Sequence, residues 1–323
     1  MKSSVFHLEV NGATMAVHQW LPEGEVVGML QVSHGMAEHG GRYAALAQSL
    51  TDHGWMVIAG DHRGHGQTAT VPSGPGTAVD ADPLGTLGHF ADHNGWRSVV
   101  DDLRSVALHA TTQHPGVPHV LLGHSMGSLL ARDYASQYSH DLAGLVLSGT
   151  PRAQGLIGSA ARVMARNLVR ARGPKSRAHL LHKLTFGSYN SAFKPNRTDF
   201  DWLSRDTAVV DAYVADPRCG FVCTNALYVD LIGGLARVND RKTMKGTGKK
   251  LAILVLTGSM DPAGGERAAL ALKAFYKGIG NKHVQVNTYK GARHEVYNDT
   301  NRGSVVHDLV GWLDGRLAKR KAS

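Results

Sequence analysis

The sequence predicts an α/β fold with a mainly parallel central sheet flanked by helices. Strand-like apolar segments alternate with amphipathic helical segments along most of the 323 residues, which is the pattern of a doubly wound sheet. A Gly-x-Ser-x-Gly motif at residues 123–127 stands between one of these strands and the following helix. The alternation stops for about a hundred residues near the middle of the chain, which is longer than a simple crossover needs.

Eight segments of the sequence are predicted to be strands. The first two lie close together and are joined by Asn11-Gly12, a pair typical of the tight turn of an antiparallel hairpin. From the third strand onward, strands alternate with helices, so we expect these later strands to be mainly parallel. The predicted strands are residues 6–10, 15–20, 26–33, 55–60, 119–123, 142–149, 251–258 and 283–289, and the predicted core helices are residues 42–54, 96–111, 128–137, 266–277 and 304–318.

The interruption lies between the sixth and seventh predicted strands, from Thr150 to Leu251. Because two strands of one sheet can be joined by far fewer residues, part of this interval is expected to be an insertion. We predict that residues 151–230 form a helical cap or lid inserted after the sixth strand. Residues 1–150 and 231–323 then form the first and second parts of the core.

The first cap helix, about residues 156–172, is predicted to be amphipathic. Its apolar side carries Ile157, Ala160, Ala161, Met164 and Leu168, and its opposite side carries Arg162, Arg166 and Arg170. The longer segment 151–198 holds ten Lys and Arg residues and no Asp or Glu, in a chain of formal net charge +9. A solvated outer face and transient contact of the basic cap with anionic membrane surfaces both explain this pattern.

Composition and charge restrict the class of protein. The positive charge comes without an aromatic-interleaved basic platform or a reading helix, so we expect no nucleic-acid partner. The N-terminal sequence lacks the apolar stretch of a signal peptide, and the longest apolar runs are strand-sized, so we expect a cytoplasmic protein, with peripheral membrane association as the alternative. Cys219 and Cys223 lie four residues apart in a predicted helix and are interpreted as reduced thiols. No pattern in the sequence indicates an oligomeric state.

The motif Gly123-His124-Ser125-Met126-Gly127 predicts a catalytic nucleophile. Between a strand and a helix, this pattern forms a strained turn that lifts the serine hydroxyl above the carboxyl edge of the sheet, and glycines flank the serine because side chains there would clash. The pattern also occurs by chance, so a purely structural role is the alternative. The strand before the motif and the helix after it favour Ser125 as the nucleophile.

The other two members of a catalytic triad are predicted from their positions after strands. A serine hydroxyl needs a base, and an imidazole base needs a carboxylate that holds its tautomer and stabilises its cation. In this architecture the order along the chain is serine, acid, histidine. Asp261 follows the seventh predicted strand and is the predicted acid, and His294 follows the eighth and is the predicted base. Asp216, Asp230 and Asp240 are weaker candidates for the acid because no predicted strand precedes them.

Attack on an ester carbonyl creates an oxyanion that two rigid backbone N–H groups usually stabilise. One donor is predicted to be the N–H of Met126, which follows the nucleophile at the helix start. The other is predicted to come from the Gly-rich turn His34-Gly35-Met36 after the third strand, and we choose Met36. The alternative for the Met36 side chain is plain lining of the pocket.

Five motifs spread along the chain match a known family. They are HGMAEHGGRY at 34–43, DHRGHGQT at 61–68, GHSMGS at 123–128, GSMDP at 258–262 and GARHEVYNDTNR at 291–302. With them the chain resembles the monoacylglycerol lipase and lysophospholipase family of serine α/β-hydrolases, which is often grouped with serine aminopeptidases. The resemblance covers nearly the whole chain and implies the α/β-hydrolase fold. It also implies Ser125, Asp261 and His294 as the triad and Met36 and Met126 as oxyanion donors.

The cap resembles this family more loosely. Residues 199–221 are similar to the segment that returns from the family's cap to its core, in which Tyr213 can approach a polar head group of the substrate. The alternative for Tyr213 is a role in packing.

Two other enzyme classes are less compatible with the sequence. A metal-dependent hydrolase is suggested by His34, His39, Asp61, His62 and His65, but a binuclear site would need a denser run such as His-x-His-x-Asp-His. We therefore expect no metal, and we interpret His62 and His65 as bracing the loop beside the oxyanion turn. An epoxide hydrolase or dehalogenase of this fold would carry Asp at the position of Ser125.

The sequence therefore predicts a carboxylic ester hydrolase that forms an acyl-enzyme and needs no cofactor. The resemblance implies single-chain lipid esters as substrates, with monoacylglycerol first, and a cap with apolar helix faces can house one acyl chain. The alternatives are a lysophospholipase and a broad-specificity short-chain esterase. From a different class, a non-catalytic ligand-binding member of the fold is the distant alternative.

Overall fold

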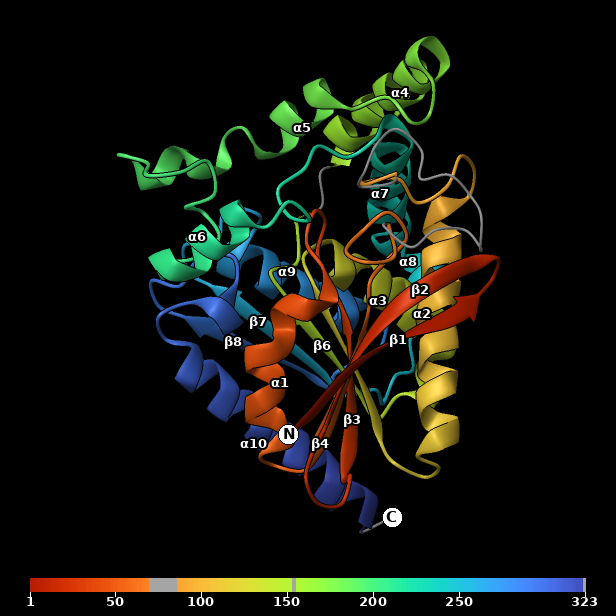
Figure 1. Cartoon of the computed structure of the whole chain (residues 1–323), viewed down its shortest axis with the longest axis vertical. Helices are drawn as coiled ribbons and strands as arrows, with labels where there is room; N and C mark the ends of the chain where they lie inside the picture. The colour runs from red at the N-terminus through yellow and green to blue at the C-terminus, as the bar shows by residue number, and fades with distance from the viewer. Residues whose placement is uncertain (70–85, 153–154, 322–323) are drawn as a thin grey trace.

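One mixed sheet forms the centre of the molecule. The computed structural model describes residues 1–69, 86–152 and 155–321, and within them eight strands lie in the order β1-β2-β4-β3-β5-β6-β7-β8 (Figure 1). The strands are β1 (Lys2–Val10), β2 (Ala13–Leu21), β3 (Gly28–Ser33), β4 (Trp55–Gly60), β5 (His119–His124), β6 (Gly144–Ser148), β7 (Ile253–Gly258) and β8 (Val284–Tyr289). Strand β2 pairs antiparallel with β1 and β4, and the pairs from β4 through β3 to β8 are parallel. The predicted mainly parallel sheet is confirmed.

The hairpin of β1 and β2 forms where the sequence predicts it. The turn residues Asn11 and Gly12 both have positive φ, 45° and 75°. This is the requirement of a type I′ turn, whose twist matches that of the two strands and which Asn-Gly adopts readily. The hairpin adds two antiparallel strands at one edge of the parallel sheet.

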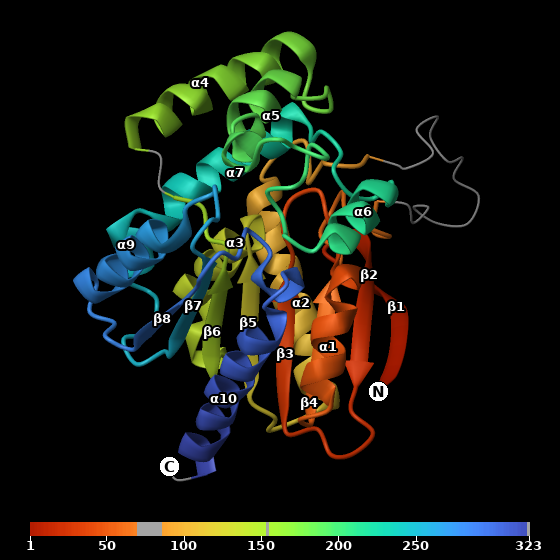
Figure 2. The ribbon, with the colours of Figure 1, turned by 90° about the vertical axis from the view of Figure 1, so that its left-hand side faces the viewer.

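Helices cover both faces of the sheet. Leu121 and Val255 point to one face and pack in a core with α2, α3 and α9, while Val120 and Leu254 point to the other and pack with α1 and α10. Figure 2 shows α1 and α10 on the side of the sheet that faces the viewer. The core helices are α1 (Ala44–Thr51), α2 (Gly95–Gln113), α3 (Met126–Tyr138), α9 (Gly265–Gly278) and α10 (Arg302–Lys321), with 3-10 turns η1 (Gly40–Tyr43), η2 (Ser139–Asp141) and η4 (Val296–Asn298).

A helical insertion follows β6, as predicted, and its helices lie at one end of the sheet (Figure 1). The elements of this region are α4 (Gly155–Arg172), α5 (His179–Phe186), η3 (Tyr189–Phe193), α6 (Thr207–Ala215), α7 (Asn225–Val238) and α8 (Arg241–Met244). The predicted boundary at residue 230 falls inside α7, which packs against α4 and also against α2 and α3 of the core. We propose that the cap ends where α7 begins. None of the helices in the described residues combines the length and the apolar character that crossing a membrane requires.

The predicted helix around the two cysteines is wrong. Helix α6 ends at Ala215, and Cys219 and Cys223 lie in the irregular segment before α7. Pro217 disfavours continuation of the helix, and Gly220 adopts φ +70°, a left-handed conformation that reverses the chain. Both thiols are free and buried.

The close packing of α3 on β3 gives a test of the fold. A Cβ atom on Gly127 would overlap the carbonyl oxygen of Ser33, so Gly127→Ala should lower the free energy of unfolding by about 3 kcal/mol or more. The control is Gly311→Ala in α10, where nothing lies within 4 Å of the added carbon. This control should raise the free energy of unfolding by about 0.5–1 kcal/mol, because Ala favours helix over Gly. Urea unfolding of both variants measures the difference, and equal stabilities would contradict this account.

Candidate active site

The motif serine occupies a strained turn between β5 and α3. Strand β5 ends at His124 and α3 begins at Met126, and Ser125 between them has φ 51° and ψ −119°, a conformation that L-residues rarely adopt. The N–H of Ser125 donates to the carbonyl of Ser148 on β6 at 2.9 Å, which holds the turn against the next strand. Because α3 passes so close to β3 at Gly127, the chain must reverse within one residue. This reversal places Ser125 at the carboxyl edge of the sheet.

The structure brings the predicted acid and base together. Asp261 follows β7 and His294 follows β8, and their side chains meet with Nδ1 of His294 at 2.9 Å from Oδ1 of Asp261. Both side chains are buried, and Oδ1 of Asp261 also accepts the N–H of Ala263 at 2.9 Å. Burial by itself lowers the pKa of His294, but the charge and hydrogen bond of Asp261 outweigh it and raise this pKa above its ordinary value. The pair is arranged to hold the imidazole and to stabilise its cation.

Two neutral rings flank the imidazole of His294. The Trp202 ring, from the segment that returns from the cap, lies 5.0 Å away between centroids, and the His124 ring from the serine motif lies 4.8 Å away. Burial lowers the pKa of His124 to about 4, so this second histidine is neutral at pH 7. The N–H of His294 also donates to the carbonyl of Trp202 at 3.3 Å. The cap therefore contributes directly to the position of His294.

The two predicted oxyanion donors are available for hydrogen bonding. Among the described residues, the backbone N–H groups of Met36 and Met126 meet no acceptor within hydrogen-bonding distance. Met126 is the first residue of α3, where N–H groups have no partner inside the helix. Met36 belongs to a turn, residues 34–38, that we call the oxyanion turn. A Cβ on Gly35 in this turn would lie 3.3 Å from the Cβ of Ser125, so the turn passes directly beside the serine.

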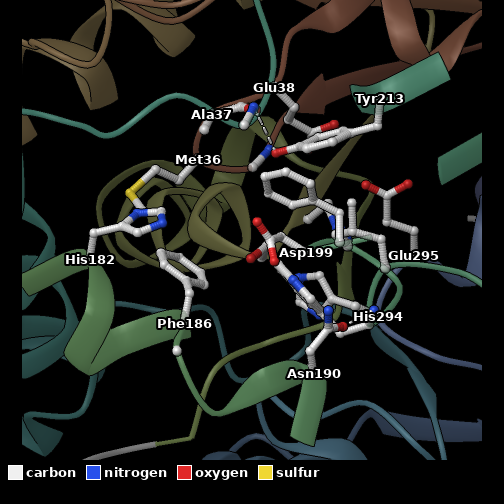
Figure 3. A pocket seen from close by; sticks show the side chains of 18 of the residues that line it. Met36, Ala37, Glu38, His182, Phe186, Asn190, Asp199, Tyr213, His294 and Glu295 are labelled. Atoms are coloured by element: carbon white, nitrogen blue, oxygen red, sulfur yellow. Dashed lines mark hydrogen bonds between the residues drawn. The ribbon is translucent and has the colours of Figure 1, made fainter. Parts of the chain in front are cut away.

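Two cavities meet at Ser125. The first, of about 540 Å³, is lined by polar and aromatic side chains (Figure 3). The second, of about 770 Å³, is lined mainly by apolar residues of the cap and of α3 and α7. Both are lined by Met36, Ser125 and Phe186. The polar cavity also contacts Glu38, His124, His182, Lys183, Asn190, Asp199, Trp202, Tyr213, His294 and Glu295, and the apolar cavity contacts Leu129, Ala160, Ala161, Met164, Leu181, Leu184, Tyr228, Leu231, Ile232 and Leu235.

The first cap helix separates the apolar cavity from a second groove. Met164 of α4 lines the apolar cavity, while Arg162, Arg166 and Arg170 line a groove of about 1110 Å³ between α4 and α7. The Nε atom of Arg162 is buried and has no hydrogen-bond partner among the described residues. The predicted amphipathic character of this helix agrees with the structure, but its arginine side is not wholly solvated.

Tyr213 lines the polar cavity, yet its hydroxyl is already bonded to the protein. The hydroxyl donates to the carbonyl of Ala37 at 2.8 Å and accepts the N–H of Gly220 at 3.1 Å. The side chain is buried, and the guanidinium of Arg42 lies 4.7 Å from the centre of its ring. One lone pair of the hydroxyl oxygen remains for a head group of the substrate.

Three buried histidines cluster at the oxyanion turn, of which His34 is the first residue of the turn. The rings of His34 and His62 are 4.0 Å apart, and the ring of His65 lies 5.4 Å from that of His34. The N–H of His62 donates to Nε2 of His34 at 2.9 Å, and Nε2 of the His62 ring is hydrogen-bonded to the Oγ hydroxyl of Ser33 at 3.2 Å. Burial lowers the pKa of His62 to about 3 and that of His65 to about 4. These contacts agree with the interpretation that His62 and His65 brace this turn.

The carboxylates beside this turn are occupied by hydrogen-bond donors. In the part of the chain that the structure describes, metal-ligating atoms converge in the groups His18–His39–Asp61 and His39–Asp216–Cys219. The two carboxylate oxygens of Asp61 already accept the N–H groups of Gly40 and Gln67, each at 2.7 Å. Asp216 likewise accepts from Arg218 and from His39. Since N–H donors occupy these carboxylates, the residues fit hydrogen bonding better than metal ligation.

Sequence reasoning missed a chain of ion pairs that borders the polar cavity, in which two buried carboxylates share one partly buried arginine. Arg42 donates to Glu38 of the oxyanion turn at 2.8 Å and to both carboxylate oxygens of Glu295 at 2.7 and 2.8 Å. All three residues belong to motifs that the sequence presents, HGMAEHGGRY and GARHEVYNDTNR. The acidic and basic residues inside these motifs were the available signal, but their pairing across 253 positions depends on the fold.

Comparison with known proteins identifies the family of this chain. The family model described as "Serine aminopeptidase, S33" matches residues 24–301 of the chain. The chain belongs to this family. The chain is similar to a monoacylglycerol lipase of Mycolicibacterium smegmatis, 28% identical over 311 residues, which are 95% of each chain. A monoglyceride lipase of Mus musculus is 29% identical over 325 residues, covering 96% of this chain and 90% of the mouse protein.

Solved structures confirm the α/β-hydrolase fold of this S33 family member. A thermostable carboxyl esterase from Bacillus coagulans, solved with glycerol, has a TM-score of 0.85 at 25% identity and covers 98% of this chain and 99% of its own. A soluble variant of the monoglyceride lipase from Saccharomyces cerevisiae, in complex with a substrate analogue, has a TM-score of 0.73 at 18% identity, with 97% and 96% coverage. The family resemblance and the fold class predicted from the sequence are both confirmed.

The buried histidines predict how stability depends on pH. Burial lowers the pKa of His62, His65, His119 and His124 to between about 3 and about 4, whereas an unfolded histidine titrates near 6.5. Between these values the unfolded chain binds more protons, so the free energy of unfolding should fall as pH decreases from 6.5 toward 4. Each ring contributes a slope of about 1.4 kcal/mol per pH unit in this window.

Urea unfolding at several pH values between 7 and 5 measures this slope. The variant His119→Leu should reduce the slope by about 1.4 kcal/mol per pH unit, the contribution of one proton, because burial alone lowers the pKa of this side chain. His119 lines neither cavity at Ser125, so the substitution leaves the candidate site unchanged. A slope identical to that of the wild type would show that His119 is not neutral in the folded state.

Proposed function

We propose that this protein hydrolyses single-chain lipid esters, monoacylglycerols first, through an acyl-enzyme on Ser125. The chain is a carboxylic ester hydrolase of the S33 family, whose relatives include the proteins named monoacylglycerol lipase and monoglyceride lipase. The observation that carries the choice of substrate is the junction of one apolar and one polar cavity at Ser125. An ester carbonyl held at this junction would place its acyl chain in one cavity and its alcohol in the other.

The proposed reaction begins when Oγ of Ser125 attacks the ester carbonyl carbon. His294 accepts the hydroxyl proton through Nε2, and Asp261 holds Nδ1 and stabilises the imidazolium. The negative charge that forms on the carbonyl oxygen is stabilised by the N–H groups of Met36 and Met126. When the tetrahedral intermediate collapses, the C–O bond to the alcohol breaks and His294 gives its proton to the leaving glycerol oxygen.

Water completes the proposed cycle. It enters from the polar cavity, which the departing glycerol has left, and His294 takes one of its protons as it attacks the acyl-enzyme carbonyl. The same two N–H groups stabilise the second oxyanion, and the bond to Oγ of Ser125 then breaks. Free fatty acid leaves, and the proton held by His294 returns to Ser125.

The shapes and linings of the two cavities support a single-chain substrate. The apolar cavity is lined by Leu129, Met164 and Ile232 among others, and burying an acyl chain there contributes about 0.8 kcal/mol per methylene. The polar cavity offers Asn190, Asp199 and one lone pair of the Tyr213 hydroxyl to the alcohol. An apolar cavity of about 770 Å³ that meets a polar cavity at Ser125 suits a lipid with one acyl chain and a polar alcohol.

One observation favours a lysophospholipid as the second candidate substrate. Lys183 and Asp199 both line the polar cavity, both are exposed, and neither forms an ion pair within the described residues. A lysine ammonium suits a phosphate, and a carboxylate suits a quaternary ammonium or ethanolamine group. A zwitterionic head group would engage both side chains, whereas glycerol would engage neither by charge.

We also propose that the cap contacts anionic membrane surfaces transiently. Val163, Leu180 and Leu184 are large apolar side chains of α4 and α5 that remain 61%, 50% and 64% exposed. Arg166 and Arg170 of α4 are exposed near them in sequence. Proteins that associate peripherally with membranes typically insert apolar side chains into the membrane interface, while neighbouring arginines pair with lipid phosphates. Leu184 also lines the apolar cavity, so contact there would bring lipid to its entrance.

The variant Ser125→Ala tests the proposed function. It should remove essentially all turnover while leaving the fold intact, because the nucleophile is lost and nothing else changes. Hydrolysis rates are measured on 1-monooleoylglycerol, lysophosphatidylcholine, a short p-nitrophenyl ester and a proline aminoacyl amide. Asp261→Asn and His294→Ala should each lose activity on their own. Combined with Ser125→Ala, they should cause no further loss.

The outcomes on these four substrates separate the alternatives. Preference for monooleoylglycerol supports the monoacylglycerol lipase, and preference for lysophosphatidylcholine supports the second candidate. Activity on the short ester alone would contradict a lipid substrate, and no activity on any of them would indicate a ligand-binding protein. More than about a hundredth of the wild-type rate in Ser125→Ala would exclude this serine as the nucleophile.

The membrane proposal predicts a dependence on salt and on the arginines of α4. Hydrolysis of monooleoylglycerol in anionic vesicles should fall when ionic strength rises, because salt screens the attraction. Replacing Arg162, Arg166 and Arg170 together by Gln should weaken vesicle binding about tenfold or more, since each basic residue near the surface contributes about 1 kcal/mol. The matched control replaces Lys273, Lys277 and Lys282, which are exposed on or after α9. Equal effects of the two triple variants would show that only net charge matters.

A further inference from the structure

We propose that Tyr213 and Arg42 are positioning residues that hold the oxyanion turn in the geometry that catalysis needs. This inference rests on the proposed function, because it assumes that the N–H of Met36 stabilises the oxyanion. Through Tyr213, the segment 199–221 that returns from the cap would set the position of this donor. The family resemblance implied contact of Tyr213 with the head group of the substrate, with a role in packing as the alternative.

The oxyanion turn contains a strained residue next to its donor. Ala37 has φ +56°, a left-handed conformation that costs a residue with a Cβ free energy and persists only where surrounding contacts impose it. The carbonyl oxygen of Ala37 accepts two hydrogen bonds from the cap-return segment, from the Tyr213 hydroxyl at 2.8 Å and from the N–H of Gly220 at 3.0 Å. Figure 3 shows Tyr213 beside Ala37 and Glu38, with Met36 following along the wall of the cavity. These contacts are the ones that impose the left-handed conformation from outside the turn.

The peptide unit that carries the Met36 N–H is fixed on its other side by His34. The N–H of His62 donates to Nε2 of His34 at 2.9 Å, so Nε2 is unprotonated and the neutral ring carries its proton on Nδ1. Nδ1 then donates to the carbonyl oxygen of Gly35 at 2.8 Å. That oxygen and the Met36 N–H belong to the same planar peptide unit, so fixing one fixes the direction of the other.

Arg42 holds the turn from a third direction. Oε1 of Glu38 accepts the N–H of Gly35 at 2.5 Å, and Oε2 of Glu38 accepts from Arg42 at 2.8 Å. Arg42 in turn binds both oxygens of Glu295, the residue that follows the catalytic base. The Arg42 guanidinium also lies over the Tyr213 ring, 4.7 Å from its centre. One partly buried cation therefore contacts the turn, the loop of the base and the cap-return segment.

The two roles of Tyr213 differ in which substrates they affect. A head-group contact acts only on esters that carry the head group, and its loss raises KM for those esters. Holding an oxyanion donor acts on every ester, because every tetrahedral intermediate has the same oxygen, and its loss lowers kcat. A p-nitrophenyl ester has no glycerol hydroxyls and so separates the two roles.

The experiment compares Tyr213→Phe with wild type on 1-monooleoylglycerol and on p-nitrophenyl butyrate. We expect kcat to fall about tenfold on both esters, less than the loss of an entire oxyanion donor, with KM changed less than about twofold. The matched control is Tyr289→Phe, which removes another buried tyrosine hydroxyl, one that donates to Asp308 at 3.0 Å away from the turn. Tyr289→Phe should leave kcat unchanged on both esters, so a loss of stability alone does not explain the result.

A second variant, Arg42→Lys, keeps the positive charge and loses the fork that binds both Glu38 and Glu295. It should also lower kcat on both esters. A higher KM for monooleoylglycerol alone in Tyr213→Phe would overturn the proposal in favour of head-group contact. Unchanged kinetics on both esters in either variant would also overturn the proposal. Ser125→Ala separates the failure of the two proposals. If this variant retains activity, the proposed function fails. If it is inactive while the kinetics of Tyr213→Phe equal those of the wild type, only the present inference fails.

Discussion

The contact of helix α3 with strand β3 is the constraint on which the active site depends. A Cβ on Gly127 would overlap the backbone of Ser33, and one on Gly123 would overlap the carbonyl of Gly127. Because α3 follows β5 directly and packs this closely on β3, the chain reverses at Ser125, which takes a φ of 51°. The same closeness puts the oxyanion turn, which follows β3, beside the serine. One packing contact thus sets the positions of both Ser125, the proposed nucleophile, and the turn beside it.

The cap contributes to the chemistry as well as to the enclosure of the site. Trp202 packs against the imidazole of His294 and accepts its backbone N–H, while Tyr213 bonds to the strained carbonyl of Ala37. The base and the oxyanion turn, which come from opposite halves of the core, therefore both contact the segment 199–221. Arg42 connects the same two regions through buried carboxylates. Displacement of this segment would change the catalytic geometry and the substrate cavity together.

Much of this arrangement was predictable because it depends on local pattern. Alternating apolar strands and amphipathic helices gave the sheet, Asn11-Gly12 gave the hairpin, and positions after strands singled out Asp261 and His294 among many acids and histidines. The helix around the cysteines was wrong because Pro217 and Gly220 outweigh a short apolar pattern. The predicted cap boundary at residue 230 falls inside α7, one continuous helix that packs on both the cap and the core, and a pattern along the chain carries no signal for this double packing.

The sequence by itself determined the order of the strands and helices along the chain and the place of the insertion, and it supplied Ser125, Asp261 and His294 as the candidates for the triad. These follow from periodicity and from residues that act on their immediate neighbours along the chain. Only the tertiary structure decided which side chains meet across long separations, such as Arg42 with Glu295 and Tyr213 with Ala37. It also decided that two cavities of different polarity join at Ser125. Such contacts depend on how distant segments pack, and a linear pattern carries no signal for that packing.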